Sequence, residues 1–262
     1  MALIVLASAS GSPGVTTTAL GMALVWHRPV VLVDADPVGG SALLAGYFQG
    51  TVSDDDAMVN LVLARRDGRL AEVLPRAMIT VPGTHVSILP GPKSHAQAGS
   101  LTELWGALAY ELRALEETGQ DVIVDAGRLG MVHAPNGLIR AADLALLVSR
   151  TDLPALAAAR QWAFAWTEAA QDGTGASGAA ALLVGSGRPY DASEVAKVFA
   201  MPVLGTLAWE PRSARVFSEG LRPAGSAWSQ RDLLVRSYRA AAAAITQRVT
   251  AEQTAMSPGG VR

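Results

Sequence analysis

The segment formed by residues 3–26 constrains the fold of this chain more than any other part of the sequence. An apolar run, Leu3 to Leu6, predicts a buried strand, and residues 16–26 predict a helix. Between them, residues 10–17 read Ser-Gly-Ser-Pro-Gly-Val-Thr-Thr. A strand, a glycine-containing turn and a helix N-terminus are the parts of a phosphate-binding loop, because backbone N–H groups at the helix start point toward an anion.

The loop itself supplies the candidate ligand-binding positions. Backbone amides of the turn would surround a phosphate, and the hydroxyl groups of Thr16 and Thr17 would contact phosphate and Mg²⁺. The complete set of candidates is Ser10, Gly11, Ser12, Pro13, Gly14, Val15, Thr16 and Thr17.

The loop contains no lysine. A working phosphate-binding loop has a lysine directly before the threonine, where its ammonium group neutralises the β- and γ-phosphates; here that position is Val15. The only lysines are Lys93 and Lys197, and neither is near the loop in sequence. A charge pair near a protein surface is worth about 4 kcal/mol at ~4 Å. The sequence therefore predicts a nucleotide-type fold with weak or absent triphosphate binding.

The composition is that of a folded domain. The chain has 262 residues, of which 50% are hydrophobic, and a net charge of −2. This charge gives no general attraction to nucleic acid or anionic membranes, and the lack of cysteine excludes disulfides and thiolate metal sites. The N-terminus lacks the basic segment of a secretory signal, and no apolar stretch approaches the ~18 residues of a membrane span. We expect a cytoplasmic protein with no integral membrane segment.

Short apolar runs alternate with helical segments along the chain, which is typical of a parallel sheet covered on both faces. We expect a single three-layer α/β/α domain with a mostly parallel sheet over residues 1–250, followed by a disordered tail over residues 251–262. The predicted strands are Leu3–Ala7, Val30–Val33, Val86–Leu89, Val122–Val124, Leu144–Val148, Ala181–Val184 and Val203–Leu207.

Carboxylates follow two of these strands. Asp34 and Asp36 come directly after the second strand, and Asp125 ends the apolar run 122–124. Carboxylates in these places can hold Mg²⁺ directly or through water, or orient an attacking water. Because they occur together with the loop in this order, they indicate a P-loop nucleotide fold.

These motifs resemble those of the MinD/ParA family of deviant P-loop ATPases. The family motif x-K-G-G-x-x-K-[ST] aligns with residues 9–16, and the family's D-x-D-P segment with residues 34–37. The chain departs from the motif at Ser10 and Val15, which replace both lysines, and at Ser12, which replaces the second glycine. After Asp125, the usual Thr-Pro-Pro is Ala-Gly-Arg.

The resemblance implies a role for each aligned residue. Asp36 would orient the attacking water, Asp125 would be the Walker B carboxylate, and Thr16, Asp34 and Asp125 would surround Mg²⁺ if ATP binds. Leu204–Leu207 followed by Glu210 and Pro211 resembles the base-binding loop, which makes Pro211 a candidate cofactor contact. The resemblance also implies a homodimer and a protein partner from a partition, pilus or secretion system.

Two functional hypotheses stay open at this point. In the first, the chain is a degenerate positioning or assembly protein that binds and hydrolyses ATP weakly or not at all. In the second, it is an active partitioning ATPase in which Arg128 or Arg150 replaces the lost lysine. A dinucleotide-dependent oxidoreductase is a remote third reading, because the loop is not G-x-G-x-x-G. Nonspecific DNA binding is a further expectation, from arginines between residues 210 and 248: Arg212, Arg215, Arg222, Arg231, Arg236, Arg239 and Arg248.

Overall fold

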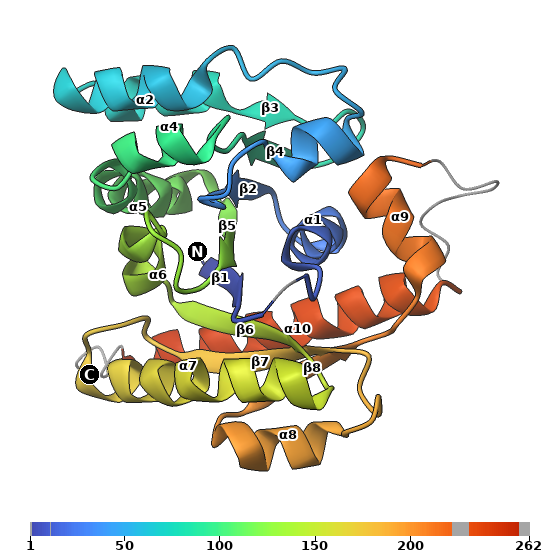
Figure 1. The fold of residues 1–262 in the computed structure, drawn as a ribbon. Coiled ribbons are helices and arrows are strands. Elements are labelled where there is room, and N and C mark those ends of the chain that lie inside the picture. Colours follow the sequence, from blue (N-terminus) through green and yellow to red (C-terminus); the bar gives the residue numbers. More distant parts are fainter. Residues whose placement is uncertain (1, 11, 222–230, 257–262) are drawn as a thin grey trace, which may run out of the picture.

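The computed structural model describes residues 2–10, 12–221 and 231–256, and within these residues the strands form one sheet (Figure 1). The eight strands are ordered β3-β4-β2-β5-β1-β6-β7-β8. All neighbouring strands are parallel except β3 and β4. The strands are β1 (Leu3–Ser8), β2 (Val30–Asp34), β3 (Ile79–Thr80), β4 (Val86–Leu89), β5 (Asp121–Arg128), β6 (Leu144–Arg150), β7 (Ala179–Val184) and β8 (Val203–Leu207).

The predicted α/β architecture with a mostly parallel sheet is confirmed. Every predicted strand overlaps an observed one, and β3 is the strand that the sequence did not predict. With only two residues, β3 is too short to produce a recognisable apolar pattern. It pairs antiparallel with β4 and forms one end of the sheet.

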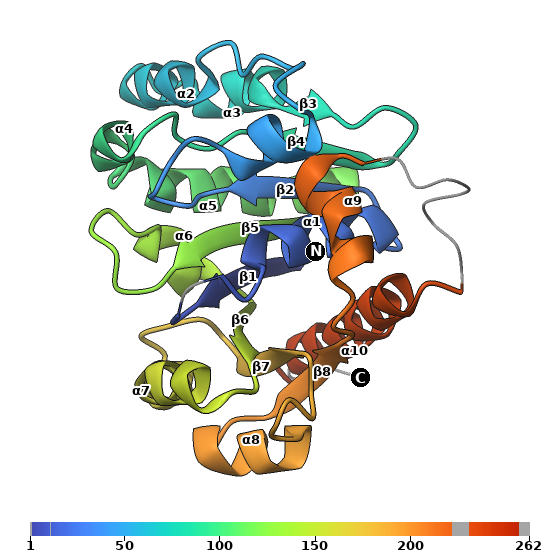
Figure 2. The ribbon, with the colours of Figure 1, turned by 45° about the vertical axis from the view of Figure 1, so that its right-hand side comes forward.

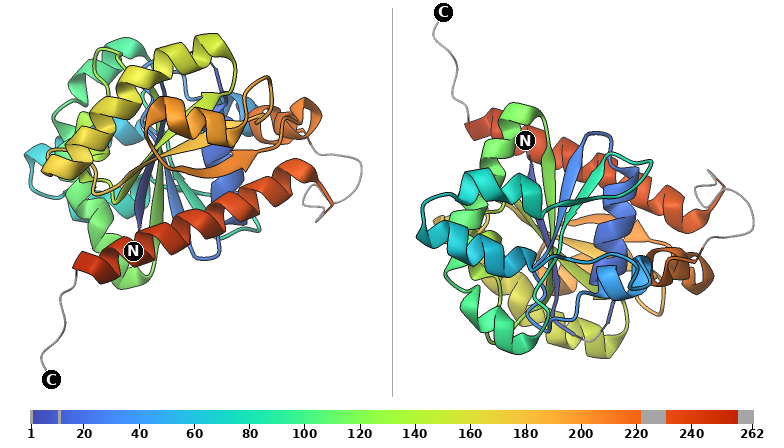
Figure 3. Two further views of the ribbon diagram at one scale, coloured as in Figure 1. Left: turned by 90° about the horizontal axis from the view of Figure 1, so that it is seen from below. Right: turned by 90° about the horizontal axis from the view of Figure 1, so that it is seen from above.

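Helices cover both faces of the sheet. One face carries α1 (Val15–Val25), α9 (Pro211–Glu219) and α10 (Leu233–Met256), and Figure 2 shows α9 beside α1. Figure 3 shows α10 and α7 on opposite sides of the sheet. The other helical segments are α2 (Ala57–Arg66), α3 (Leu70–Val73), α4 (His95–Ser100), α5 (Leu104–Ala114), α6 (Asn136–Ala141), α7 (Leu153–Asp172) and α8 (Ala192–Phe199), with a π-helical turn at Leu43–Tyr47 and 3₁₀ turns at Leu74–Ala77 and Leu115–Thr118.

Side chains alternate between the two faces of the sheet along each strand, and this alternation produces two apolar cores. In β1, Leu3 and Val5 join the core that includes residues of α5 and α7, whereas Ile4 and Leu6 join the core that includes α1 and α10. All four side chains are fully buried. Successive side chains of a strand point to opposite faces, so a continuous apolar run is what a central strand of a three-layer domain requires.

The C-terminal helix continues further than the sequence predicted for the folded part of the chain. Helix α10 runs to Met256, so it includes residues 251–256 of the range expected to be a tail. Residues 257–262 lie outside the described residues. Among the helices that the structure describes, none combines the length and apolar character that a membrane crossing requires.

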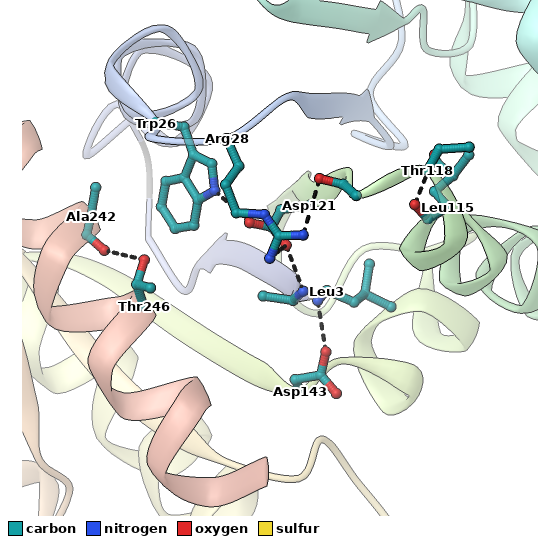
Figure 4. Close-up of polar contacts among 11 residues, drawn as sticks. Leu3, Trp26, Arg28, Leu115, Thr118, Asp121, Asp143, Ala242 and Thr246 are labelled. Carbon is teal, nitrogen blue, oxygen red and sulfur yellow. Dashed lines mark hydrogen bonds and ion pairs between the residues drawn. The ribbon is translucent and has the colours of Figure 1, made fainter. Parts of the chain in front are cut away.

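Two carboxylates, the buried Asp121 and the partly buried Asp143, anchor the amino edge of the central strands (Figure 4). The Asp121 carboxylate accepts hydrogen bonds from the Ala2 backbone N–H and from Trp26 Nε1, both at 2.9 Å, and lies 3.6 Å from the Arg28 guanidinium. One strand further along, Asp143 Oδ2 accepts the Leu3 N–H at 2.7 Å. These contacts join the beginning of β1 to β5, α1 and β6, and so position the strand that leads into the loop.

We expect Asp121→Ala to lower the free energy of unfolding by about 3 kcal/mol. The substitution leaves two buried N–H donors without their acceptor, and each unsatisfied donor costs roughly 1–3 kcal/mol. Urea unfolding monitored by circular dichroism measures the change. Asp67→Ala, which removes an exposed ion pair with Arg69, is the control and should cost less than about 1 kcal/mol. Equal losses in both variants would contradict the anchoring role of Asp121.

Candidate functional site

The predicted loop connects β1 to α1 at the carboxyl edge of the sheet. Helix α1 begins at Val15, and Gly14 precedes it with φ 91° and ψ 43°, a left-handed conformation that glycine adopts without strain. The Thr18 N–H donates to the Gly14 carbonyl at 2.8 Å, which closes the first helical turn. The first amides of a helix have no partner within the helix. The start of α1 therefore leaves backbone amides that can face an anion; Gly11 of the loop lies outside the described residues.

Val15 occupies the position of the missing lysine, and its side chain is buried. It is 7% exposed and belongs to the apolar core that includes α1 and α10. Thr16 and Thr17, which follow it, are partly exposed. The first turn of α1 thus provides amides and hydroxyl groups at the loop and no positive side chain.

Two buried carboxylates lie side by side on adjacent strands, one at the end of β2 and one within β5. Asp34, the last residue of β2, pairs in register with Asp125 of β5. The Ser41 hydroxyl donates to Asp34 Oδ2 at 2.7 Å, and the backbone of Gly91 is so close that a Cβ there would lie 2.6 Å from the Asp34 carboxyl carbon. Asp125 is 1% exposed; its Oδ1 accepts the Gly127 N–H at 3.0 Å, whereas its Oδ2 has no hydrogen-bond partner.

Asp36 lies between these strands and the surface. It is partly buried, and its Oδ1 accepts the Val38 N–H at 2.9 Å. Gly127 approaches it with φ 63°, and a Cβ at Gly127 would collide with the Asp36 carboxylate. The structure therefore brings all three predicted carboxylates to one edge of the sheet, with the segment after β5 in contact with the segment after β2.

Burial raises the pKa of both buried carboxyls, Asp34 and Asp125. Burial is the main reason that the pKa of Asp34 rises to about 6, and the Ser41 hydrogen bond opposes the rise. Burial likewise raises the pKa of Asp125 to about 7; the Asp34 charge adds to this rise, and the Thr16 hydroxyl opposes it. Two carboxylates so near each other cannot both be charged cheaply without a cation.

The donor set fits Mg²⁺ only together with a phosphate. Asp125 Oδ2 is a buried acceptor without a partner, and the neighbouring Thr16 hydroxyl is a second oxygen ligand of the type that Mg²⁺ prefers. Within the described residues, no cluster of three or more His, Cys, Asp or Glu side chains could hold a metal ion. Phosphate oxygens and water would therefore have to complete the coordination.

Of the arginines proposed to replace the lysine, the structure brings Arg150 into contact with the loop. Arg150 Nη2, at the end of β6, donates to the Ser12 carbonyl at 3.1 Å, and its guanidinium lies 4.9 Å from the ring centroid of Trp209. Arg128 is exposed at the end of β5. Lys93 lies on an exposed loop, where it pairs with Asp54 at 3.1 Å and with Asp56 at 2.5 Å.

A cavity of about 230 Å³ separates the loop from the segment after β8. Its lining includes Ser12, Gly14, Arg150, Trp209 and Pro211, so the predicted base-binding Pro211 faces the same space as the loop. Sequence reasoning missed Trp209 as a lining residue. Its place two residues after a predicted strand and directly before Glu210 was the available signal.

A loop between β1 and α1, with Asp34 at the end of β2 and Asp125 beside it on β5 in a mostly parallel sheet, is the arrangement of the P-loop NTPase fold. Solved structures of known proteins share this fold. MinD from Pyrococcus furiosus is 18% identical with a TM-score of 0.70, and the match covers 95% of this chain and 100% of MinD.

Two further structures extend the comparison. MinD from Pyrococcus horikoshii, solved with Mg-ADP, is 17% identical over 95% of this chain and 97% of its own, with a TM-score of 0.69. A ParA-family ATPase from Chlorobium tepidum is 14% identical, with a TM-score of 0.70. The match covers 92% of this chain and 98% of that ATPase. No protein-family model and no curated protein matches the sequence significantly. The predicted resemblance to MinD/ParA ATPases is thus confirmed at the level of the fold.

The raised pKa values predict that stability falls as pH rises from about 4 to 7. The folded protein retains protons on Asp34 and Asp125 that the unfolded chain releases near pH 4, so the folded state loses its advantage as these groups ionise. Asp125→Asn should raise the free energy of unfolding by roughly 2 kcal/mol at pH 8 and by much less at pH 4.

Denaturant unfolding at a series of pH values measures this effect. Asp55→Asn, at an exposed position, is the control and should leave the pH profile unchanged. A gain from Asp125→Asn of the same size at pH 4 and pH 8 would show that the carboxyl of Asp125 is not the titrating group.

Proposed function

We propose that this chain is a ParA/MinD-like positioning or assembly protein that binds and hydrolyses ATP weakly or not at all. The observation that carries the proposal is the buried Val15 at the lysine position, in a chain that keeps the carboxylates of Asp34, Asp36 and Asp125. With this arrangement, the site presents acidic groups to the phosphates of ATP and has no loop lysine to neutralise the negative charge.

The electrostatic loss is large compared with ordinary binding energies. One lysine at ~4 Å from a phosphate oxygen contributes about 4 kcal/mol near a surface, which corresponds to roughly a thousandfold in affinity. Mg²⁺, when bound with a nucleotide, would supply positive charge beside Thr16 and Asp125. It would not replace a lysine that stabilises charge developing on the phosphate in the transition state.

The partners belong to the same proposal. We propose a homodimer through the loop face and a protein partner from a partition, pilus or secretion system, acting in the cytoplasm. The fold shared with MinD and a ParA-family ATPase supports this proposal. Exposed arginines on α9 and α10, among them Arg212, Arg236 and Arg239, support nonspecific contact with DNA phosphates.

Calorimetric titration with Mg-ATP and Mg-ADP tests the loss of nucleotide binding. We expect the wild type to bind no tighter than about 1 mM, and Val15→Lys to bind at least about tenfold more tightly, because a long flexible lysine stem can reach from the helix start toward the phosphates. Val59→Lys adds the same charge on the exposed face of α2 and is the matched control. Micromolar binding by the wild type, or an ATPase rate abolished by Asp36→Ala, would contradict the proposal.

The contact between Arg150 and the loop favours a second candidate function. An active partitioning ATPase would need a cation at the phosphates, and Arg150 already donates to the Ser12 carbonyl at 3.1 Å. Its Nε is buried without a hydrogen-bond partner, so this guanidinium retains a donor for a further ligand.

If Arg150 replaces the lysine, Arg150→Ala should weaken Mg-ATP binding by about 100-fold or more, as expected when a charge-assisted contact worth ~3 kcal/mol is lost. Arg128→Ala, at the exposed end of β5, is the matched comparison and should bind normally. The same titration measures both variants. Normal binding by Arg150→Ala would eliminate Arg150 as the substitute, and normal binding by both would eliminate the arginine hypothesis.

A further inference from the structure

Helix α7 carries an exposed stripe that no other element covers in the described part of the chain. The helix lies on the outside of the molecule against β6 and β7, with α8 beside it (Figure 1). One face of α7 is buried, through residues such as Leu156, Ala159 and Ala163. The opposite face exposes Leu153, Ala157, Arg160, Phe164 and Glu168, at the three- and four-residue spacing of a single helical stripe.

The apolar residues of this stripe are unusually exposed. Leu153 is 64% exposed and Phe164 60% exposed. Ala158 and Ala165 are exposed beside them and have side chains small enough for another backbone to approach closely. From residue 153 to 168, the only charged residues are Arg160 and Glu168. An exposed aromatic residue among small side chains, with few charges, is typical of an interaction surface.

The two charges lie symmetrically about Phe164. Arg160 precedes it by four residues and Glu168 follows it by four, so each is displaced from Phe164 by about 6 Å along the helix axis. They are too far apart to pair with each other on one helix. Neither has an ion-pair partner among the residues that the structure describes.

We propose that α7 pairs antiparallel with α7 of a second copy of this chain, around a two-fold axis at Phe164. In this arrangement Arg160 of each copy lies level with Glu168 of the other, and the two Phe164 rings meet at the axis. A two-fold interface requires such a self-complementary surface, because residue i contacts residue j in both directions. A parallel arrangement would place like charges opposite each other. The interface needs no nucleotide and does not include the loop between β1 and α1.

The strength of this dimer follows from its size. Helix α7 has 20 residues and is about 30 Å long, so one helix pair buries less than the roughly 1,200–2,000 Å² of a standard interface. We therefore expect a reversible dimer with a dissociation constant in the range of about 1–100 μM.

Charge reversal provides the sharpest test. Sedimentation velocity of the nucleotide-free full chain should show a concentration-dependent dimer. Arg160→Glu and Glu168→Arg, each alone, should weaken the dimer at least about tenfold, because each creates two like-charge pairs. The double reversal should restore dimerisation to within about threefold of the wild type. A wild type that is monomeric throughout, or a double variant no better than the single ones, would overturn the proposal.

Phe164 provides a second test at the axis. Phe164→Glu should weaken the dimer by more than about 100-fold, since it places two carboxylates against each other. Tyr110→Glu is the control, because Tyr110 is 76% exposed on α5, away from α7. Val38→Glu tests the alternative interface at the loop, because Val38 lies beside Asp36. If Val38→Glu abolishes the dimer and Phe164→Glu does not, the interface is at the loop and the proposal is overturned.

The absence of cysteine from the sequence allows a covalent test. Phe164→Cys should form an intermolecular disulfide under mild oxidation, because residues on the axis of two closely packed helices come within disulfide range. Tyr110→Cys should form none under the same conditions. Equal cross-linking of both variants would show random collision and overturn the proposed pairing.

Discussion

The burial of β1 between β5 and β6 is the constraint on which the rest of the structure depends. Because β1 is covered on both faces, its position is set by its two neighbours and by the contacts at its amino edge, where Asp121 and Asp143 accept the first backbone N–H groups. The same parallel register then places the ends of β2 and β5 beside the loop that leaves β1. The site at the carboxyl edge is thus a consequence of strand register, and its carboxylates are buried for the same reason.

This burial gives the site an unusual charge balance. In a phosphate-binding loop with its lysines, positive side chains oppose the carboxylates and the phosphates together. Here Val15 contributes to the apolar core instead, and burial raises the pKa of both Asp34 and Asp125. The Arg150 guanidinium contacts the loop, where the Ser12 carbonyl and the Trp209 ring hold it.

The sequence predicts the sheet and the loop because these depend on local pattern. Continuous apolar runs identify the long buried strands, and Gly14 with Thr16 and Thr17 identifies the start of α1. The side-chain contacts of the site could not be predicted from the sequence, because they join residues that lie far apart in the chain. Arg150 meets the loop across 138 residues, and Lys93 pairs with an acidic turn that precedes it by 37 residues at Asp56. The burial of Val15 likewise follows from packing, since its residue type alone is compatible with an exposed helix start.

Two separate dimer surfaces on one protomer would allow assembly beyond a dimer. A protomer with one two-fold interface forms a closed dimer and stops there. A protomer that used both the loop face and α7, each with its own two-fold axis, would link to two neighbours, and such linkage produces either a closed ring or an open filament. The angle between the two axes decides which one forms. For the proposed positioning protein, assembly through α7 would then be controlled by concentration and partner binding, because the proposed α7 interface includes no residue of the loop between β1 and α1.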